Sequence, residues 1–266
     1  MKTERIHHDP EDLKRIQSLR LIDNVFMNIC FDGYKKGAKL LLKIILGRDD
    51  LKVTDVKTQK QLNSLNGRSV WLDIYATDST GSKYDIEIQR ASKGANPKRA
   101  RYHSSMVDSS MLKEGEDFAH LRENYVIFIT EKDVIGSNKP IYHIDRVILE
   151  DNIQFEDGEH IIYVNGSIRT DDSALGKLMS DFYCTKADGM YYKELSDKVR
   201  HYKESEEGVK AMCDIWEEVK NEGKIEASIE NAKTMLRLSK LSLEEIAVCS
   251  GLSIEKVREL AGNKSA

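Results

Sequence analysis

The chain has no apolar run long enough to cross a bilayer, and its first twelve residues, MKTERIHHDPED, are polar. A transmembrane helix needs about 20 consecutive apolar residues, and a secretory signal needs an apolar segment of roughly 7–15. Neither is present in the sequence. We therefore expect a cytoplasmic protein without a membrane partner.

Cysteine is scarce, and the pattern of histidine shows no ligand spacing. The four cysteines are far apart, without a C-x-x-C pair: Cys30, Cys184, Cys213 and Cys249. This spacing argues against both a zinc site and a disulfide framework. None of the seven histidines has a partner at the spacing of a metal site or a catalytic triad. The chain also lacks a GxxxxGK[ST] phosphate loop, so nucleotide-driven chemistry is not indicated.

The charge balance excludes a protein that coats nucleic acid by bulk electrostatics. The formal net charge is −4, from 41 Lys and Arg against 45 Asp and Glu. Local contacts to phosphate remain possible, because positive charge gathers over residues 35–48 and again over residues 93–101. The length of 266 residues suits one sizeable domain with a small appendage.

The most informative segment is RSVWLDIYATDSTGSKYDIEIQR, residues 68–90. Two runs of alternating apolar and polar residues flank the cluster Thr77–Gly81, which supplies turn residues, so the segment predicts a β-hairpin. Side chains alternate between the two faces of a strand. One face of the first strand would carry Trp71, Asp73 and Tyr75, and one face of the second Asp85, Glu87 and Gln89.

If these faces coincide, Asp73 and Glu87 lie side by side on adjacent strands. Facing carboxylates repel each other and lose hydration, and a divalent cation would compensate both effects. The alternative, without a functional role, is a pair of exposed charges on a solvated hairpin. Asp73 lies within the apolar run VWLDIY, where an unpaired carboxylate is costly, and this favours a metal site.

Asp73, thirteen intervening residues and then Glu87-Ile88-Gln89 resemble the active-site hairpin of the PD-(D/E)XK nuclease superfamily. The surrounding residues are similar to one branch, the recombination-promoting nucleases (Rpn), also called PD-(D/E)XK nuclease family transposases. The supporting segments, across roughly the first half to two thirds of the chain, are Asp23–Phe26, Leu40–Leu46, Arg99–Tyr102 and Tyr125–Thr130.

The resemblance implies an α/β fold: a restriction-endonuclease-like αβββαβ core with a mixed central sheet and a helical C-terminal extension. It also implies that Asp73 and Glu87 bind Mg²⁺, for which Mn²⁺ can substitute, with the backbone carbonyl of Ile88 as a third oxygen ligand. Gln89 would complete the catalytic set by orienting the attacking water or the scissile phosphate.

Two positions depart from the superfamily pattern. Leu72 precedes Asp73 where the superfamily name has proline, and Gln89 replaces the lysine. Lysine would stabilise an attacking hydroxide by its charge, whereas glutamine offers only a neutral donor and acceptor. Catalysis would therefore depend more heavily on the metal.

Four further residues are candidates for the site. The resemblance suggests Asp23 as an additional acidic residue, although a helix cap or a hydrogen bond to the backbone is an equally good interpretation. Arg99, Arg101 and Tyr102 follow the hairpin and are candidate phosphate contacts. A tyrosine at helical spacing is more often simply packed.

The remaining elements are read from periodicity and capping signals. We expect mainly helix up to residue 50, with a helix starting near Asp9–Asp12. The other expected elements are a strand over 52–57, a helix over 96–114, a strand over 125–130, strands over 141–150 and 160–164 joined by an acidic loop, and helices over 172–184 and from residue 190.

We expect three parts: a nuclease-like domain over 1–205, a long helical arm over 206–240 and a helix-turn-helix-like tail over 241–266. In the tail, Ser242 and Ser253 can each cap a short helix around Gly251. The second helix would be the one to read DNA, but it is not strongly basic. Packing or homodimerisation through these helices is therefore favoured over DNA reading.

The sequence thus predicts a Mg²⁺-dependent DNA endonuclease that hydrolyses phosphodiester bonds with a metal-activated water. A link to recombination or mobile elements rests on the resemblance alone. The alternative is a non-catalytic interaction or DNA-binding protein, with the nuclease fold as a scaffold and the tail for partner binding or dimerisation. The intact Asp73, Glu87 and Gln89 favour the enzyme.

Overall fold

The computed structural model describes residues 10–64, 67–169, 172–238 and 240–262. The chain divides into two compact units. One unit comprises Gln17–Ser205, and the other combines the residues up to Ile16 with those from Glu206 onward. No helix in the described part of the chain is both long and apolar enough to cross a bilayer, although the longest has 33 residues.

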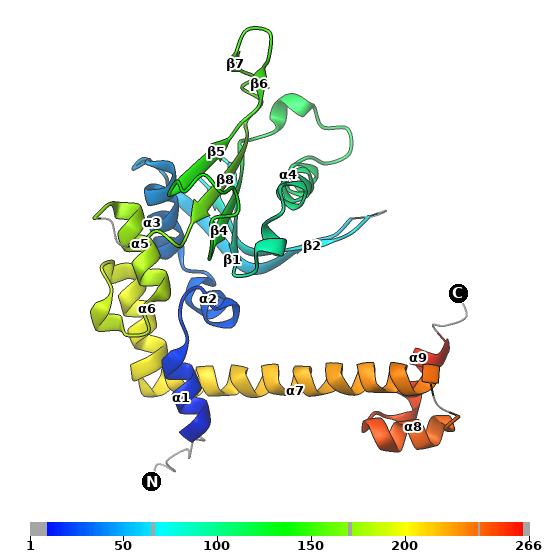
Figure 1. Cartoon of the computed structure of the whole chain (residues 1–266). Coiled ribbons are helices and arrows are strands. Elements are labelled where there is room, and N and C mark those ends of the chain that lie inside the picture. Colours follow the sequence, from blue (N-terminus) through cyan, green and yellow to red (C-terminus); the bar gives the residue numbers. More distant parts are fainter. Residues whose placement is uncertain (1–9, 65–66, 170–171, 239, 263–266) are drawn as a thin grey trace. The chain divides into compact units, whose positions relative to one another are not determined.

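A six-stranded mixed sheet forms the centre of the larger unit, with strand order β1-β2-β3-β4-β8-β5 (Figure 1). β1, β2 and β3 are antiparallel, β3, β4 and β8 are parallel, and β5 is antiparallel to β8. The predicted mixed α/β core with a helical extension is confirmed. The strands are β1 Val53–Leu62, β2 Val70–Asp78, β3 Lys83–Gln89, β4 Asn124–Thr130, β5 Ile141–Ile144 and β8 Glu159–Asn165.

Helices cover both faces of this sheet. α4 packs on one side against β3, β4 and β8, whereas α2 and α3 contact β1 and α5 packs on α3 (Figure 1). Every residue of β4 is buried, as expected for a central strand with parallel neighbours. The helices of this unit are α2 Asn24–Phe31, α3 Lys35–Leu46, α4 Pro97–Met111, α5 Ala174–Tyr183 and α6 Lys193–Glu204, whereas most of α1 Pro10–Ser18 belongs to the smaller unit.

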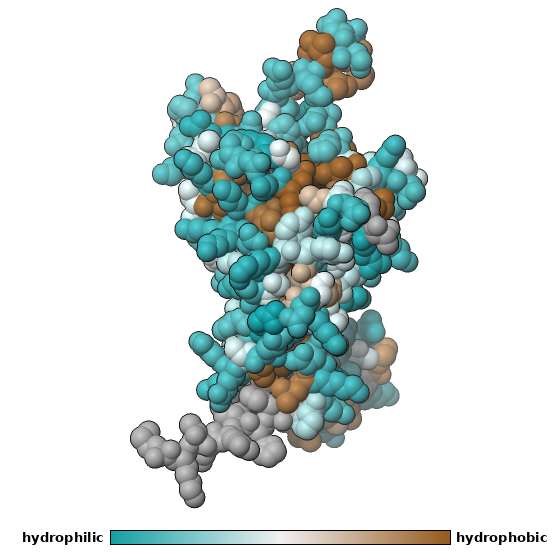
Figure 2. Space-filling model, turned by 90° about the vertical axis from the view of Figure 1, so that its left-hand side faces the viewer, coloured by the Kyte–Doolittle hydropathy of each residue, from teal (hydrophilic) through white to brown (hydrophobic). Residues whose placement is uncertain are grey.

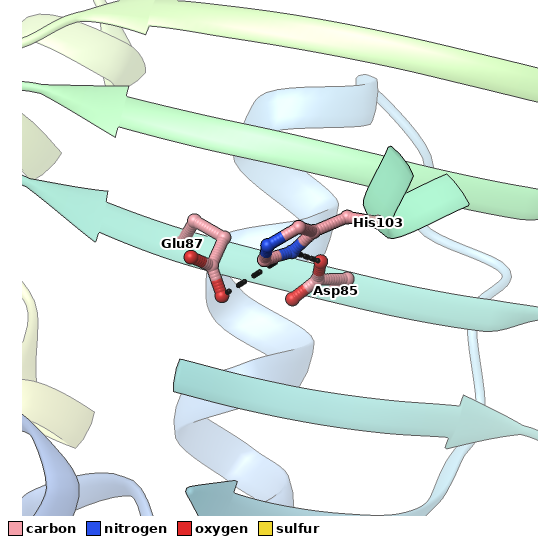
Figure 3. Close-up of side chains that lie close together, drawn as sticks. All are labelled: Asp85, Glu87 and His103. Carbon is pink, nitrogen blue, oxygen red and sulfur yellow. Dashed lines mark hydrogen bonds and ion pairs between the residues drawn. The ribbon is translucent and has the colours of Figure 1, made fainter. Parts of the chain in front are cut away.

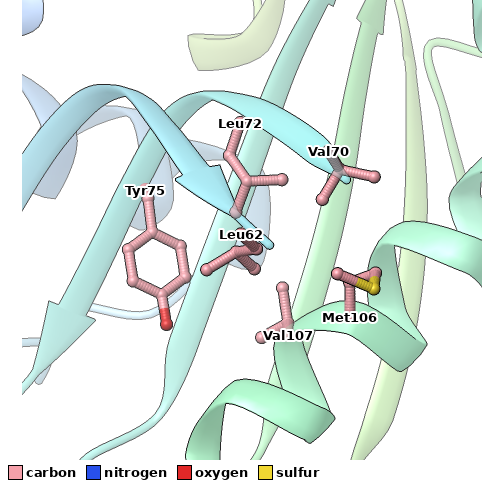
Figure 4. Packing of buried hydrophobic residues seen from close by; sticks show 6 residues of the cluster. All are labelled: Leu62, Val70, Leu72, Tyr75, Met106 and Val107. Atoms are coloured by element: carbon pink, nitrogen blue, oxygen red, sulfur yellow. The ribbon is translucent and has the colours of Figure 1, made fainter. Parts of the chain in front are cut away.

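An apolar cluster packs α4 against β1 and β2. It consists of buried side chains from β1, β2 and α4 (Figure 4): Leu62, Val70, Leu72, Tyr75, Met106 and Val107. Burying a side chain of this size contributes roughly 1.5–3 kcal/mol to folding before entropy is subtracted. The cluster therefore gives α4 a defined position over β3, on which the candidate site depends.

The predicted hairpin is confirmed, and its turn is held by Asp78. One carboxylate oxygen of Asp78 accepts hydrogen bonds from the backbone N–H groups of Thr80 and Ser82, and the other accepts the hydroxyl of Tyr84. Gly81 completes the turn with φ of +90°, a conformation that a residue with a side chain adopts only at a cost in free energy.

The predicted strand over 141–150 is wrong in part. β5 ends at Ile144, and Val147–Ile148 (β6) pairs instead with Ile153–Gln154 (β7) in a separate two-stranded hairpin (Figure 1). The expected acidic loop therefore contains a strand. The break falls at Asp145 and Arg146, whose side chains pair with His160 and Asp157. Alternation alone could not show where the pairing partner changes.

The projecting β6–β7 hairpin carries exposed apolar side chains, seen as the brown patch at the top of Figure 2. Leu149 and Phe155 are 83% and 57% exposed. Nothing in the described part of the larger unit covers them.

The smaller unit contains the C-terminal helices α7 Glu206–Leu238, α8 Leu243–Ser250 and α9 Ile254–Gly262. Ser242 and Glu245 form a capping box at α8, and Gly251 ends that helix with φ of +71°. Ala232, Ile246 and Val257 bury a common core among the three helices. The helical hairpin predicted for the tail is therefore present and packs on the end of α7.

Candidate active site

The candidate site lies where the ladder between β2 and β3 ends. Backbone pairing runs to Ile74 and Ile86, and the same register continued places Asp73 opposite Glu87. Beyond this point, hydrogen bonds between backbone N–H groups and side-chain carboxylates join the two strands instead. The Asp73 N–H donates to Glu87 Oε1 at 3.0 Å, and the Ile88 N–H donates to Asp73 Oδ2 at 2.9 Å. The structure thus brings Asp73 and Glu87 together.

A second carboxylate on β3 lies directly behind Glu87. Asp85 and Glu87 occupy alternate positions of the strand and both face α4 (Figure 3). The Asp85 side chain is fully buried, and that of Glu87 is 1% exposed. Three acidic side chains, counting Asp73, therefore meet in a largely dehydrated place.

α4 supplies the basic groups that face these carboxylates. The helix starts at Pro97, and the Asn96 side chain caps it by accepting the Lys98 N–H. Arg99 and His103, one turn apart, therefore project from the same face. This is the local reason that both side chains reach β3.

Arg99 connects the catalytic candidates to one another. Its Nη2 donates to Glu87 Oε2 at 2.6 Å, and its Nη1 donates to Gln89 Oε1 at 2.9 Å. Its Nε donates to His103 Nε2 at 3.2 Å. One planar guanidinium thus orients a carboxylate, an amide and an imidazole.

The bond from Arg99 determines the protonation of His103. A guanidinium N–H can only donate, so His103 Nε2 accepts and carries no proton. The Nδ1–H then donates to Asp85 Oδ2 at 2.9 Å. Burial lowers the pKa of His103, in agreement with a neutral imidazole.

The acidic groups are costly to ionise without a further positive charge. Burial raises the pKa of Asp85 to about 8. Burial, with Asp85 and Asp73 nearby, raises the pKa of Glu87 to about 9. Asp85 Oδ1 is buried and has no hydrogen-bond partner among the described residues. Either protons or a cation must therefore neutralise this site.

The donor atoms fit a divalent cation. One oxygen each of Asp85 and Glu87 and one nitrogen of His103 lie within 4.8 Å of one another. On β2, Asp73 lies opposite Glu87 and places a further carboxylate near it. Carboxylate oxygens are the ligands that Mg²⁺ and Mn²⁺ prefer. A site formed by Asp73 and Glu87 would have oxygen ligands only, which suits Mg²⁺ better than the group that contains the His103 imidazole.

Sequence reasoning missed Asp85 and His103 as parts of this site. No histidine has a partner at the sequence spacing of a metal site or a triad, but His103 has one in space, because its partner Asp85 is 18 residues away and only the fold brings them together. A signal did exist: Asp85 shares the face of Glu87, and His103 follows Arg99 by one helical turn.

The other predicted residues lie outside this hydrogen-bond network in the described structure. Asp23 accepts the Arg20 N–H and forms an ion pair with Arg90, so the hydrogen bond to the backbone is present. The Tyr102 hydroxyl donates to the carbonyl of Arg68. Arg101 is exposed on α4. Of the three proposed phosphate contacts, only Arg99 touches the carboxylates.

Residues 38–244 match the protein family described as PD-(D/E)XK nuclease family transposase. This match covers well over half of the chain, including the hairpin and α4. The chain belongs to this family. The matched range begins after Asp23 and extends into α8. Comparisons with curated proteins and with solved structures give no match. Family membership implies a nuclease-type function and the use of a divalent metal ion.

Gly94 leaves the space that Gln89 occupies. A Cβ at this position would overlap the carboxamide of Gln89, and the Gly94 carbonyl also accepts a hydrogen bond from Arg99. Because Gly94 has no side chain, the carboxamide of Gln89 can occupy this space.

Gly94→Ala is expected to displace Gln89 and lower nuclease activity by about 10–100-fold, since small misplacements in a site have effects of this size. Thermal stability should change little, because the overlapping atoms are the end of a flexible side chain. Gly223→Ala, where an added Cβ would meet no atom within 4 Å beyond its own helix backbone and chain neighbours, is the control. Equal cleavage rates for the two variants would contradict this role of Gly94.

Proposed function

We propose that the chain is a metal-dependent DNA endonuclease that hydrolyses phosphodiester bonds. The observation that carries the proposal is the pair of hydrogen bonds where β2 and β3 separate, from the Asp73 N–H to Glu87 and from the Ile88 N–H to the Asp73 carboxylate, in a chain of a nuclease family. Two carboxylates side by side, that of Glu87 buried and that of Asp73 partly buried, supply the oxygen ligands that a divalent cation prefers.

Asp73 and Glu87 would hold Mg²⁺, with the carbonyl of Ile88 as a third oxygen ligand. When bound, Mg²⁺ lowers the pKa of a water molecule and neutralises charge on the phosphate. Mn²⁺ has the same ligand preference and is expected to substitute.

The remaining residues bind and orient. Gln89 has no charge, so its carboxamide can align the attacking water or the phosphate but cannot stabilise a hydroxide electrostatically. Arg99 is 38% exposed and carries the positive charge that Gln89 lacks. We assign Arg99 to the scissile phosphate, and the Asp85–His103 pair to holding Arg99 in place.

DNA is the proposed partner, with Lys98 and Arg101 as exposed cations on α4 beside the site. The formal net charge of −4 makes such local contacts more important than bulk attraction. We further propose a cytoplasmic location, a role in recombination or mobile elements, and homodimerisation through the C-terminal helices. The division into a nuclease-like domain, an arm and a tail at residues 205 and 240 belongs to the same proposal.

Cleavage of supercoiled plasmid tests the function. Nicked and linear products are expected with Mg²⁺ and should disappear when a chelator is added. Absence of cleavage, together with calorimetry that finds no Mg²⁺ binding, would favour the alternative of a non-catalytic scaffold that works through its helical tail.

A further inference from the structure

The edge strand β1 contains an unusual backbone conformation directly beside the candidate site. Gln59 has φ of +50° within a ten-residue strand. A residue with a Cβ adopts this conformation only at a cost in free energy, and such strain often lies at functional sites. The pairs Thr58–Ile74 and Lys60–Leu72 leave Gln59 facing Asp73 across the strands.

The side chain of Gln59 holds the carboxylate of Asp73. Its Nε2 donates to Asp73 Oδ1 at 3.2 Å and to Asn28 Oδ1 at 3.2 Å. Because a carboxylate only accepts, the amide must present its nitrogen. The other oxygen of Asp73 accepts the Ile88 N–H, so both oxygens are oriented by neighbours.

α2 supplies the support for this unusual backbone. Asp32, at the C-terminal end of α2, accepts both the N–H and the hydroxyl of Thr58 at 3.2 Å. Asn28, one turn earlier, accepts from Gln59 itself. One helix thus secures both the backbone before Gln59 and the amide that reaches Asp73.

We propose that Gln59 is a positioning residue that orients Asp73 for the divalent cation, and that the strained backbone of β1 exists to aim its amide. This inference rests on the proposed function. A carboxylate oxygen that accepts an amide proton keeps a further lone pair for a cation. Groups that orient metal ligands in this way typically change metal affinity or activity 10–100-fold when they are removed.

Gln59→Gly is the decisive variant, because glycine accepts a positive φ, so the side chain and its amide are removed without adding backbone strain. Glu156→Gly is its matched control, since Glu156 has φ of +54° in the segment between β7 and β8. Mg²⁺ binding by calorimetry, plasmid nicking across a Mg²⁺ titration and thermal unfolding are measured for both variants and the unaltered chain.

We expect Gln59→Gly to bind Mg²⁺ about 10–100-fold more weakly and to need correspondingly more Mg²⁺ for nicking. Excess Mg²⁺ should restore its rate, and thermal unfolding without Mg²⁺ should match that of the unaltered chain, which would not happen if the change merely disturbed folding. Glu156→Gly should bind and nick as the unaltered chain does. Unchanged Mg²⁺ dependence in Gln59→Gly would overturn the proposal.

Two further outcomes separate this proposal from the nuclease function. If the unaltered chain binds Mg²⁺ without nicking, the nuclease function fails and the binding data alone decide the role of Gln59. If it binds no Mg²⁺, both proposals are overturned. Should Gln59→Gly fail to fold, Gln59→Asn decides: it tolerates positive φ but has too short an amide, so weakened binding supports the proposal and unchanged binding overturns it.

Discussion

Glu87→Gln is expected to lower the rate of plasmid cleavage by about 10³-fold or more. A metal ligand contributes through the charge stabilisation of its cation, worth several kcal/mol, and about 4 kcal/mol corresponds to a factor of about 10³ in rate. Glutamine has nearly the same shape, so the loss would come from the missing charge. Initial nicking rates at saturating Mg²⁺ measure the effect.

The control is Glu114→Gln, which removes an exposed carboxylate after α4 and should cleave normally. Calorimetry should also show that Glu87→Gln no longer binds Mg²⁺ at the affinity of the unaltered chain. Cleavage by Glu87→Gln at an undiminished rate would exclude Glu87 as a metal ligand and shift attention to Asp73 and Asp85.

The stability of the metal-free protein is expected to fall by a few kcal/mol as pH rises from about 5 to 9. The pKa of Asp85 rises from 3.8 to about 8 on burial, and that of Glu87 from 4.5 to about 9. At pH values between the ordinary pKa values and the raised ones, the folded chain binds more protons than the unfolded chain. Stability contributed by these groups is therefore complete at low pH and is lost as pH increases.

Denaturant unfolding in chelator at several pH values measures this slope. Glu87→Gln removes one of the two titrating groups, so its curve should be flatter and the variant should be the more stable one near pH 8. Adding Mg²⁺ at pH 8 should stabilise the unaltered chain by mass action but not the variant. Parallel pH curves for the two proteins would contradict a buried, dehydrated Glu87.

Much of the fold follows from local sequence. The hairpin was predictable because alternation has a period of two and the turn around Asp78 uses side chains that are close in sequence. The start of α4 at Asn96-Pro97 and the capping box at Ser242 are equally local. The pairing of Asp73 with Glu87 followed from the same register.

The family could also be inferred early, because the hairpin motif and its flanking segments occur in a specific order along the chain. The end of β5 could not be predicted from sequence spacing. The pairing of β6 with β7 depends on which strand each segment meets in space.

By itself, the sequence determined the hairpin, the juxtaposition of Asp73 and Glu87, and the helical tail, because each depends on contacts between residues close in the chain or on a regular period. The tertiary structure alone decided that His103 contacts Asp85 and that Gln59 contacts Asp73. Those contacts arise from α4 crossing the sheet and from the strained backbone of β1. Packing against α4 and α2 creates both contacts. Spacing along the chain indicates which residues share a face of a strand or helix, but not what that face contacts.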